Sequence, residues 1–274
     1  MTDYKVQRPQ GVSVAVTDLG GDGPVVVLLH GLAGSSRELL PTAKALDGYR
    51  VLLMDQRGHG LSSRIPEDLS RTAFASDVVA VLEELVPGRH ATLMGQSMGA
   101  HTAFLAAAAR PDLVEGLVML EGHVGGSADP SEASGIGRYF ASWPLPFKDE
   151  AAAREFLGND PIVDAWVADF QQSDGGLIPP FDAAVMQRTI EAVHEPRWGE
   201  WEDLQVPTLA VFAEHGMFSD ADKNELIRRR PGTCRVDLAG GSHDAHLDAF
   251  DQWVQTLRDW LSHDKRLASG SSGR

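Results

Sequence analysis

Residues 95–99 read GQSMG and directly follow the short apolar run ATLM at residues 91–94. After the serine, the chain continues as MGAHTAFLAAAAR (98–110), an alanine-rich segment typical of a helix. The pattern predicts that the serine lies in a tight turn between a buried strand and a helix. Glycines are expected on both sides because such a turn brings the strand and the helix too close for side chains. The serine hydroxyl would then project above the C-terminal edge of a sheet, beside the positive N-terminal end of the helix.

Apolar runs of strand length alternate with helix-length segments along the whole chain. The expected strands are residues 12–18, 25–30, 50–55, 91–95, 116–121, 208–213 and 234–238. The expected helices are residues 36–46, 71–86, 98–110, 219–230 and 250–262. Several strands are continuously apolar, which is typical of strands buried on both faces. The alternation predicts an α/β fold in which a mostly parallel sheet has helices on both faces.

The segment from Gly122 to Asp203 interrupts this alternation. It contains helical pieces without a convincing strand, and four of the six tryptophans fall in it. An insertion of this size between two strands predicts a helical cap over one edge of the sheet. Most of its aromatic side chains are expected to form the core of the cap itself. We predict that a few of them, Trp143, Phe147 and Trp166, face the domain below and bind substrate.

The predicted organisation has three parts. Residues 1–121 and 204–264 form the core domain, and residues 122–203 form the cap. Residues 265–274 include the small and polar LASGSSGR at 267–274, which is expected to be a disordered tail or a remnant of expression.

Three further motifs accompany the serine turn. HGLAGSS (30–36) and DQRGHG (55–60) each follow an expected strand, and GGSHDAHLD (240–248) follows the last strand. In their order and spacing the four motifs resemble those of the α/β-hydrolase superfamily, and the resemblance covers roughly residues 4–262. It implies the α/β-hydrolase fold, with one catalytic domain and a cap inserted between strands.

The resemblance also implies roles for individual residues. Ser97 corresponds to the nucleophile, and His243, after the last strand, corresponds to the base that must activate it. The two oxyanion donors correspond to the backbone N–H groups of Leu32 and Met98. Four other histidines in or near the motifs are expected to support loops or to pack: His30, His59, His101 and His246.

The acid of the triad departs from the common family pattern. Many members carry an aspartate after the penultimate strand, where this chain reads AEHGMFSD (213–220) and has Gly216 at the expected position. One candidate is Asp220, which we expect to begin the next helix as its N-cap. The other is Glu121, at the end of the strand GLVMLE (116–121), a position that some members use. A carboxylate at this edge of a buried strand is costly unless it is paired, so we favour Glu121.

These residues imply acyl transfer to water through an acyl-enzyme, without a metal or an organic cofactor. We predict a serine hydrolase, of the esterase or lactonase type, that cleaves an ester, lactone or amide bond of a medium-sized apolar molecule. Carbon–carbon bond hydrolysis is an alternative within enzymes, and a non-hydrolytic lyase or a small-molecule receptor is an alternative outside hydrolases. The motifs have no basic cluster nearby, so the sequence does not indicate an anionic substrate.

Composition narrows the range of partners. The formal net charge of −15 disfavours nucleic acid and membrane surfaces as partners. The single cysteine, Cys234, is expected to be a buried structural thiol. The polar N-terminus and the lack of an apolar stretch of about 18 residues predict a cytoplasmic protein. The sequence is compatible with a monomer or a homodimer that acts on a small-molecule substrate.

Overall fold

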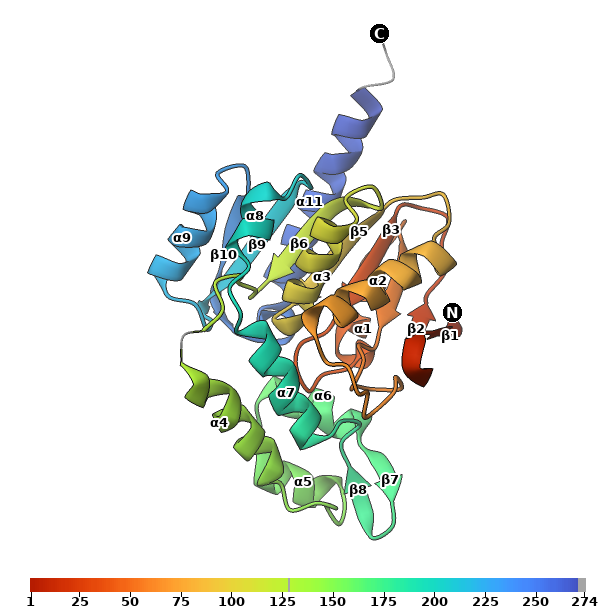
Figure 1. Ribbon diagram of the computed structural model, residues 1–274, viewed down its shortest axis with the longest axis vertical. Coiled ribbons are helices and arrows are strands. Elements are labelled where there is room, and N and C mark those ends of the chain that lie inside the picture. Colours follow the sequence, from red (N-terminus) through yellow and green to blue (C-terminus); the bar gives the residue numbers. More distant parts are fainter. Residues whose placement is uncertain (128, 271–274) are drawn as a thin grey trace.

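The computed structural model describes residues 1–127 and 129–270 of the chain. An eight-stranded sheet runs through the core and has helices on both faces (Figure 1). In spatial order its strands are β1 (Thr2–Gln7), β2 (Ser13–Asp18), β4 (Arg50–Met54), β3 (Val25–Leu29), β5 (Ala91–Gln96), β6 (Val114–Leu120), β9 (Thr208–His215) and β10 (Cys234–Ser242). The six strands from β4 to β10 are parallel, whereas β1 and β2 pair antiparallel. The predicted mostly parallel sheet is confirmed.

Two apolar layers separate the sheet from its helices. One contains side chains from α2 (Arg71–Leu85), α3 (Met98–Ala109), α8 (Trp198–Asp203) and α9 (Asp220–Arg229). The other contains side chains from α1 (Leu40–Lys44), α10 (Ala245–Asp248) and α11 (Phe250–Gly270). The central strand β3 is buried along its whole length, as its continuous run of Val and Leu predicts. Two short 3₁₀ helices, Pro9–Gly11 and Ser36–Leu39, complete the core.

The cap lies at one end of the sheet (Figure 1). It consists of α4 (Pro130–Ala141), α5 (Glu150–Leu157), α6 (Pro161–Asp169), the hairpin of β7 (Gln171–Ser173) and β8 (Gly176–Ile178), and α7 (Ala183–Val193). The hairpin was not expected from the sequence, because strands of three residues are too short to show a periodic pattern.

Helix α8 lies within the range predicted for the cap, but it packs with the core. Trp201 is fully buried there, 5.8 Å from Phe104 between ring centroids, and its indole Nε1–H donates to Leu226 O at 2.9 Å. In the structure the cap elements therefore end with α7.

Two other expectations, about the N-terminal strand and the C-terminal tail, differ from the structure. The strand β1 was not expected because its sequence is polar, and all but one of its residues are exposed. Helix α11 continues to Gly270, past the start of the predicted tail at residue 265, and residues 271–274 lie outside the described residues. Lys, Arg, Leu and Ala in this stretch favour a helix.

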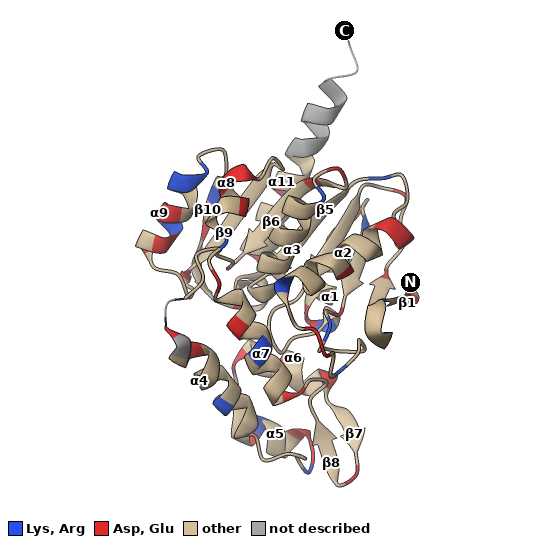
Figure 2. Ribbon diagram, in the orientation of Figure 1, with Lys and Arg blue, Asp and Glu red and all other residues tan. Residues whose placement is uncertain are grey.

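The prediction of a buried thiol is wrong, because Cys234 is exposed. It is the first residue of β10, and β10 is an edge strand of the sheet, where part of the side chains face solvent. Charged residues lie mainly on the outer helices and loops, and the central strands carry few of them (Figure 2).

Candidate active site

The turn between β5 and α3 holds Ser97 in a strained conformation. Its backbone φ is 53° and its ψ is −119°, a combination that residues other than glycine rarely adopt. The flanking glycines are required by close packing. A Cβ atom on Gly95 would lie 2.2 Å from the carbonyl carbon of Gly99, and one on Gly99 would lie 2.3 Å from the Leu29 carbonyl oxygen. This is the packing that GQSMG predicts.

The side chains of Ser97, His243 and Glu121 form a continuous chain of contacts. His243, in the turn between β10 and α10, has its Nε2 2.9 Å from Ser97 Oγ. Its Nδ1 lies 3.2 Å from Glu121 Oε2. An Nδ1–H that donates to the carboxylate leaves Nε2 free to accept the serine proton. The Gln96 side-chain amide also donates to His243 O at 2.9 Å, which fixes the backbone of this turn.

Glu121 follows the last residue of β6 and is completely buried. Its Oε1 accepts a hydrogen bond from Ala213 N at 2.8 Å, and its Oε2 accepts one from Met217 N at 2.9 Å. These two backbone donors hold the carboxylate against the end of β9, where it meets His243. Its backbone φ of 48° is also in the left-handed region, so the strand end is constrained at this residue.

The alternative acid lies elsewhere in the structure. Asp220 is the first residue of α9, and His243 Nδ1 contacts Glu121 instead of Asp220. The prediction that Asp220 caps this helix is wrong. The N-cap is Ser219, whose side chain accepts a hydrogen bond from Asp222 N, while the Asp222 side chain accepts one from Ser219 N. This capping box satisfies the helix N-terminus, so it does not need the side chain of Asp220.

The loop after β3 lies against the serine turn. A Cβ atom on Gly31 would lie 2.2 Å from Gln96 Oε1 and 3.5 Å from Ser97 Cβ. Leu32 follows Gly31 in this loop, and Met98 is the first residue of α3. Within the described part of the chain, neither backbone N–H has a hydrogen-bond partner. Both N–H groups are therefore unpaired in the described structure, and their role as oxyanion donors remains a prediction.

A buried histidine, His30, supports this loop, as expected. His30 Nδ1–H donates to Gly31 O at 2.7 Å, while its Nε2 accepts a hydrogen bond from Gln56 N at 3.0 Å. Burial lowers the pKa of His30 to about 4, so the ring is neutral at neutral pH and can accept at Nε2.

A buried acid contacts the other side of the same loop. Gly31 N donates to Glu38 Oε1 at 3.3 Å, and His246 Nε2 lies 3.7 Å from the same oxygen. Burial, reinforced by the nearby Asp244, raises the pKa of Glu38 well above its usual range. Burial, reinforced by His243, lowers the pKa of His246 to about 3. The buried pair joins the loop to α10, which contains His246.

The three predicted substrate-binding aromatics belong to one cluster in the cap. Trp143 lies 5.5 Å from Trp166 and 6.2 Å from Phe147 between ring centroids. Trp143 and Phe147 are buried, and Trp166 is partly buried. The same apolar cluster includes the side chains of Leu32 and Met98, so the core of the cap packs directly on the residues beside Ser97. A contact with substrate remains a prediction for all three.

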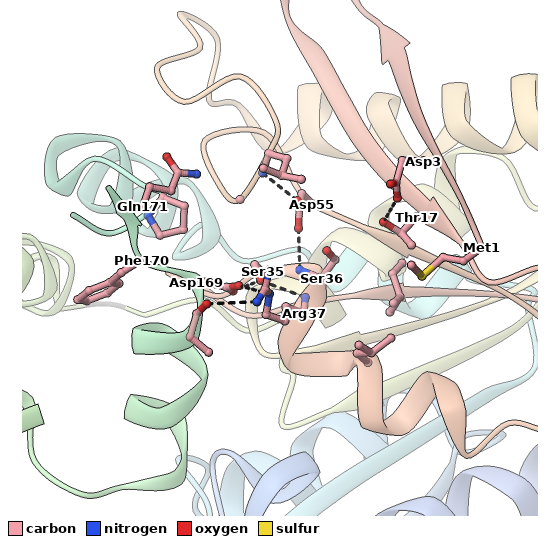
Figure 3. A pocket seen from close by; sticks show the side chains of 16 residues that line it. Met1, Asp3, Thr17, Ser35, Ser36, Arg37, Asp55, Asp169, Phe170 and Gln171 are labelled. Carbon is pink, nitrogen blue, oxygen red and sulfur yellow. Dashed lines mark hydrogen bonds and ion pairs between the residues drawn. The ribbon is translucent and has the colours of Figure 1, made fainter. Parts of the chain in front are cut away.

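A pocket of about 550 Å³ opens between the cap and the core (Figure 3). Figure 3 shows Asp169, at the end of α6, beside Ser35 and Arg37 of the core. Asp169 accepts a hydrogen bond from Ser35 Oγ and forms an ion pair with Arg37 Nε at 2.7 Å. No triad residue lines this pocket, and its polar contacts tie the cap to the core.

One polar residue beside the site was missed from the sequence. Arg71 opens α2 and is buried, with its Nη2 3.3 Å from Met98 O, the carbonyl of the residue after Ser97. An arginine in the first turn of an amphipathic helix is usually exposed, so the sequence carries no signal for this contact.

The described residues offer neither a metal site nor a membrane-spanning helix. Among the side chains that the structure describes, no group of three or more His, Cys, Asp or Glu residues could hold a metal ion. No helix in this part of the chain is long and apolar enough to cross a membrane.

Comparison with known proteins defines the class. The α/β-hydrolase fold family matches residues 24–250, and the chain belongs to this family. A 2-(acetamidomethylene)succinate hydrolase of Mesorhizobium japonicum is 31% identical over 235 residues, covering 81% of this chain and 82% of the relative. A 2-hydroxy-6-oxononadienedioate/2-hydroxy-6-oxononatrienedioate hydrolase of Pseudomonas putida is 36% identical over 260 residues, covering 90% of each. The crystal structure of an E-2-(acetamidomethylene)succinate hydrolase superposes with a TM-score of 0.85 at 25% identity, covering 95% of this chain and 99% of the other. All three of these proteins are named as hydrolases.

Proposed function

We propose that the protein is a serine hydrolase that cleaves an ester, lactone or amide bond of a small molecule. The observation that carries the proposal is the contact chain from Ser97 through His243 to Glu121, with its distances of 2.9 Å and 3.2 Å. The strained serine turn supports it, because residues held in sparsely populated backbone conformations cluster at active sites.

In the proposed reaction, Ser97 Oγ attacks the substrate carbonyl while His243 Nε2 takes the hydroxyl proton. Glu121 stabilises the resulting imidazolium through Nδ1–H. The negative charge on the carbonyl oxygen is held by the N–H groups of Leu32 and Met98, each worth about 3 kcal/mol in comparable enzymes. The carbonyl–leaving-group bond then breaks, and the leaving group takes the proton from His243. Water attacks the acyl-enzyme by the same route, which releases the acid and restores Ser97.

Carbon–carbon bond hydrolysis is the second candidate. The Pseudomonas putida relative is named for substrates that carry carboxylates, a hydroxyl and a ketone, with no ester or amide bond in the name. The same serine and histidine would act on such a ketone, because addition to a carbonyl is again the first step.

Hydrolysis of p-nitrophenyl esters of graded acyl length tests the proposal. A burst of p-nitrophenol equal to the enzyme concentration, absent from Ser97→Ala, is the expected result for an acyl-enzyme. Steady hydrolysis that Ser97→Ala retains would overturn the role of Ser97. Ser97 acylation without turnover, together with hydrolysis of a vinylogous diketone, would favour the second candidate.

A further inference from the structure

The loop after β3 makes a tight turn that contains Leu32. Gly34 N donates to Gly31 O at 3.3 Å, which closes the turn, and its two central residues are Leu32 and Ala33. The backbone φ of Ala33 is 61°, a left-handed conformation that turns usually give to glycine or asparagine at this position. Such a conformation costs free energy and persists only when the surrounding structure determines it. The direction of the Leu32 N–H therefore depends on groups that hold the turn from outside.

Two acidic side chains of the core domain hold this loop on either side of the turn. Before the turn, Gly31 N donates to Glu38 Oε1 at 3.3 Å. After the turn, Ser36 N donates to Asp55 Oδ1 at 2.7 Å. Both acids are buried. Because both belong to the core domain, neither contact involves the cap.

A third contact on the loop comes from the cap (Figure 3). Ser35 directly follows the turn and is buried, and its Oγ donates to Asp169 Oδ2, at the end of α6. The same hydroxyl accepts a hydrogen bond from Arg37 N at 3.0 Å. With one bond given and one accepted, the Ser35 side chain has a fixed direction. The cap thus contacts the residue at which the turn ends.

Asp169 also forms an ion pair, which is the weaker of its two contacts. Its Oδ1 lies 2.7 Å from Arg37 Nε, and Arg37 Nη1 donates to Ala168 O at 3.3 Å. The Arg37 side chain is 64% exposed, whereas that of Asp169 is 13% exposed. Exposed ion pairs contribute little, while a buried hydrogen bond to a charged acceptor contributes more. The bond from Ser35 is therefore the main polar link between α6 and the loop.

Apolar packing between the cap and the loop does not replace this hydrogen bond. Leu32 and Ala33 belong to the same apolar cluster as Phe140 and Trp143 of the cap. Hydrophobic contacts are non-directional, whereas a hydrogen bond requires alignment of donor and acceptor. The cluster keeps the cap against the loop, and the contact with Asp169 fixes how the end of the turn is oriented.

We propose that Asp169 is a positioning residue, through which the docked cap holds the turn so that the Leu32 N–H faces the reacting carbonyl at Ser97. Without Asp169 the Ser35 side chain loses its anchor in the cap, and the turn is free to leave its strained conformation. Substrate would still bind, but the negative charge that develops on its carbonyl oxygen would be held less well. This inference rests on the proposed function of Ser97, and it adds a link between the cap and the proposed oxyanion donor.

Hydrolysis of p-nitrophenyl acetate tests this role. In Asp169→Ala we expect kcat to fall by about 10–10², less than the factor of about 10²–10³ for an oxyanion donor that is lost altogether. KM should stay within about twofold, because the turn acts on the transition state. Asp169→Asn keeps an oxygen that accepts from Ser35, so its kcat should stay within about threefold of the wild type. A raised KM with an unchanged kcat in Asp169→Ala would overturn the proposal.

Asp164→Ala is the matched control. Asp164 is another aspartate of α6, and its ion pair is with Arg154 of α5, inside the cap. Its replacement removes a carboxylate from the same helix without removing a contact to the loop, so kcat should stay within about twofold of the wild type. Equal losses in Asp164→Ala and Asp169→Ala would overturn the proposal, because any weakening of the cap would then suffice.

Ser35→Ala removes the same hydrogen bond from the loop side, and it carries the test if Asp169→Ala does not fold. Its kcat should fall by a similar factor. The variant with both substitutions should be no slower than the slower single variant, because the two side chains act through one bond. Losses that multiply in the double variant would overturn the proposal.

Hydrogen exchange separates the contact from the chemistry. Mass spectrometry of a peptide that covers residues 30–36 should show faster amide exchange in Asp169→Ala than in the wild type, and no change in Asp164→Ala. Faster exchange in Asp169→Ala, in a protein whose wild type hydrolyses no ester, would overturn the proposed function and keep the link between cap and loop. Ester hydrolysis that Asp169→Ala retains in full would overturn the positioning role alone.

Discussion

A Cβ atom on Gly216 would lie 2.3 Å from each carboxylate oxygen of Glu121. No real Cβ atom approaches another atom so closely. The carboxylate of Glu121 thus occupies the space that a side chain at position 216 would need. Many α/β-hydrolases carry their acid at the position of Gly216, after the penultimate strand. In this chain the two placements of the acid exclude each other, and glycine at 216 is a condition for Glu121 to reach His243.

Replacing this glycine should therefore impair catalysis without touching a catalytic side chain. In Gly216→Ala the new methyl group would displace the Glu121 carboxylate from His243. We expect kcat to fall by about 10² or more, towards the factor of about 10⁴ that accompanies a misplaced histidine tautomer. Gly232→Ala is the control, because a Cβ atom there meets nothing within 4 Å. Equal kcat values for the two variants would contradict the steric argument.

The choice of acid can be tested directly. Glu121→Gln keeps the shape of the side chain but removes the charge that stabilises the imidazolium, so kcat should fall by about 10³–10⁴. Asp220→Asn changes an exposed residue at the start of α9, and its kcat should stay within about twofold of the wild type. Steady-state rates on one ester suffice. The reverse pattern would assign the acid to Asp220.

A substitution at Gly31 should displace the loop after β3, which carries the proposed oxyanion donor Leu32. In Gly31→Ala the new methyl group would meet Gln96 Oε1 at 2.2 Å and push the loop that carries Leu32 away from Ser97. We expect kcat to fall by about 10²–10³, the cost of one lost oxyanion donor.

A double-mutant cycle tests whether the clash with Gln96 is the cause of the loss of activity in Gly31→Ala. Gln96→Ala removes the group that the methyl would meet, and costs about tenfold through the lost hydrogen bond to His243 O. The double variant should then be no slower than Gln96→Ala. Fully additive losses would show that Gly31 acts by another route.

The acid sensitivity of the fold should depend on His59. Burial and the nearby His30 lower the pKa of His59 to about 3, whereas it is 6.5 in its ordinary state. Between these values the unfolded chain binds a proton that the folded chain does not, so stability is lost as the pH falls below about 6.5. His59→Asn keeps a donor for Arg57 O but does not titrate.

Urea unfolding at pH 7 and pH 5 measures this effect. The free energy of unfolding of the wild type should fall between the two pH values by about 2 kcal/mol more than that of His59→Asn. The same pH dependence in both proteins would show that His59 does not stay neutral in the folded state.

The parts of the site that could be predicted are those fixed by position along a strand. Ser97, Glu121 and His243 each follow the C-terminal end of a parallel strand, and parallel strands bring these ends to one edge. The sequence GLVMLE, read as a buried strand, is therefore enough to place Glu121 near Ser97. The absence of an acid at residue 216 is visible in the sequence as well.

Features that depend on packing between distant elements could not be predicted. Arg71 has the same local sequence signal as an exposed arginine in a first helical turn. Its burial arises because α2 packs against α3, where Arg71 contacts His101 and Thr102. Cys234 was misassigned for a related reason, since the sequence of a strand does not reveal whether it lies at the edge of the sheet. The polar sequence of β1 gave no signal at all.

Intact-mass analysis after incubation with a fluorophosphonate tests the central claim most directly. The account predicts one adduct per chain on the wild type and none on Ser97→Ala, because the agent reacts only with an activated serine. Glu121→Gln should be labelled far more slowly, while Asp220→Asn should be labelled at the rate of the wild type. A folded wild-type protein that gains no adduct, or Ser97→Ala that gains one, would contradict the triad of Ser97, His243 and Glu121.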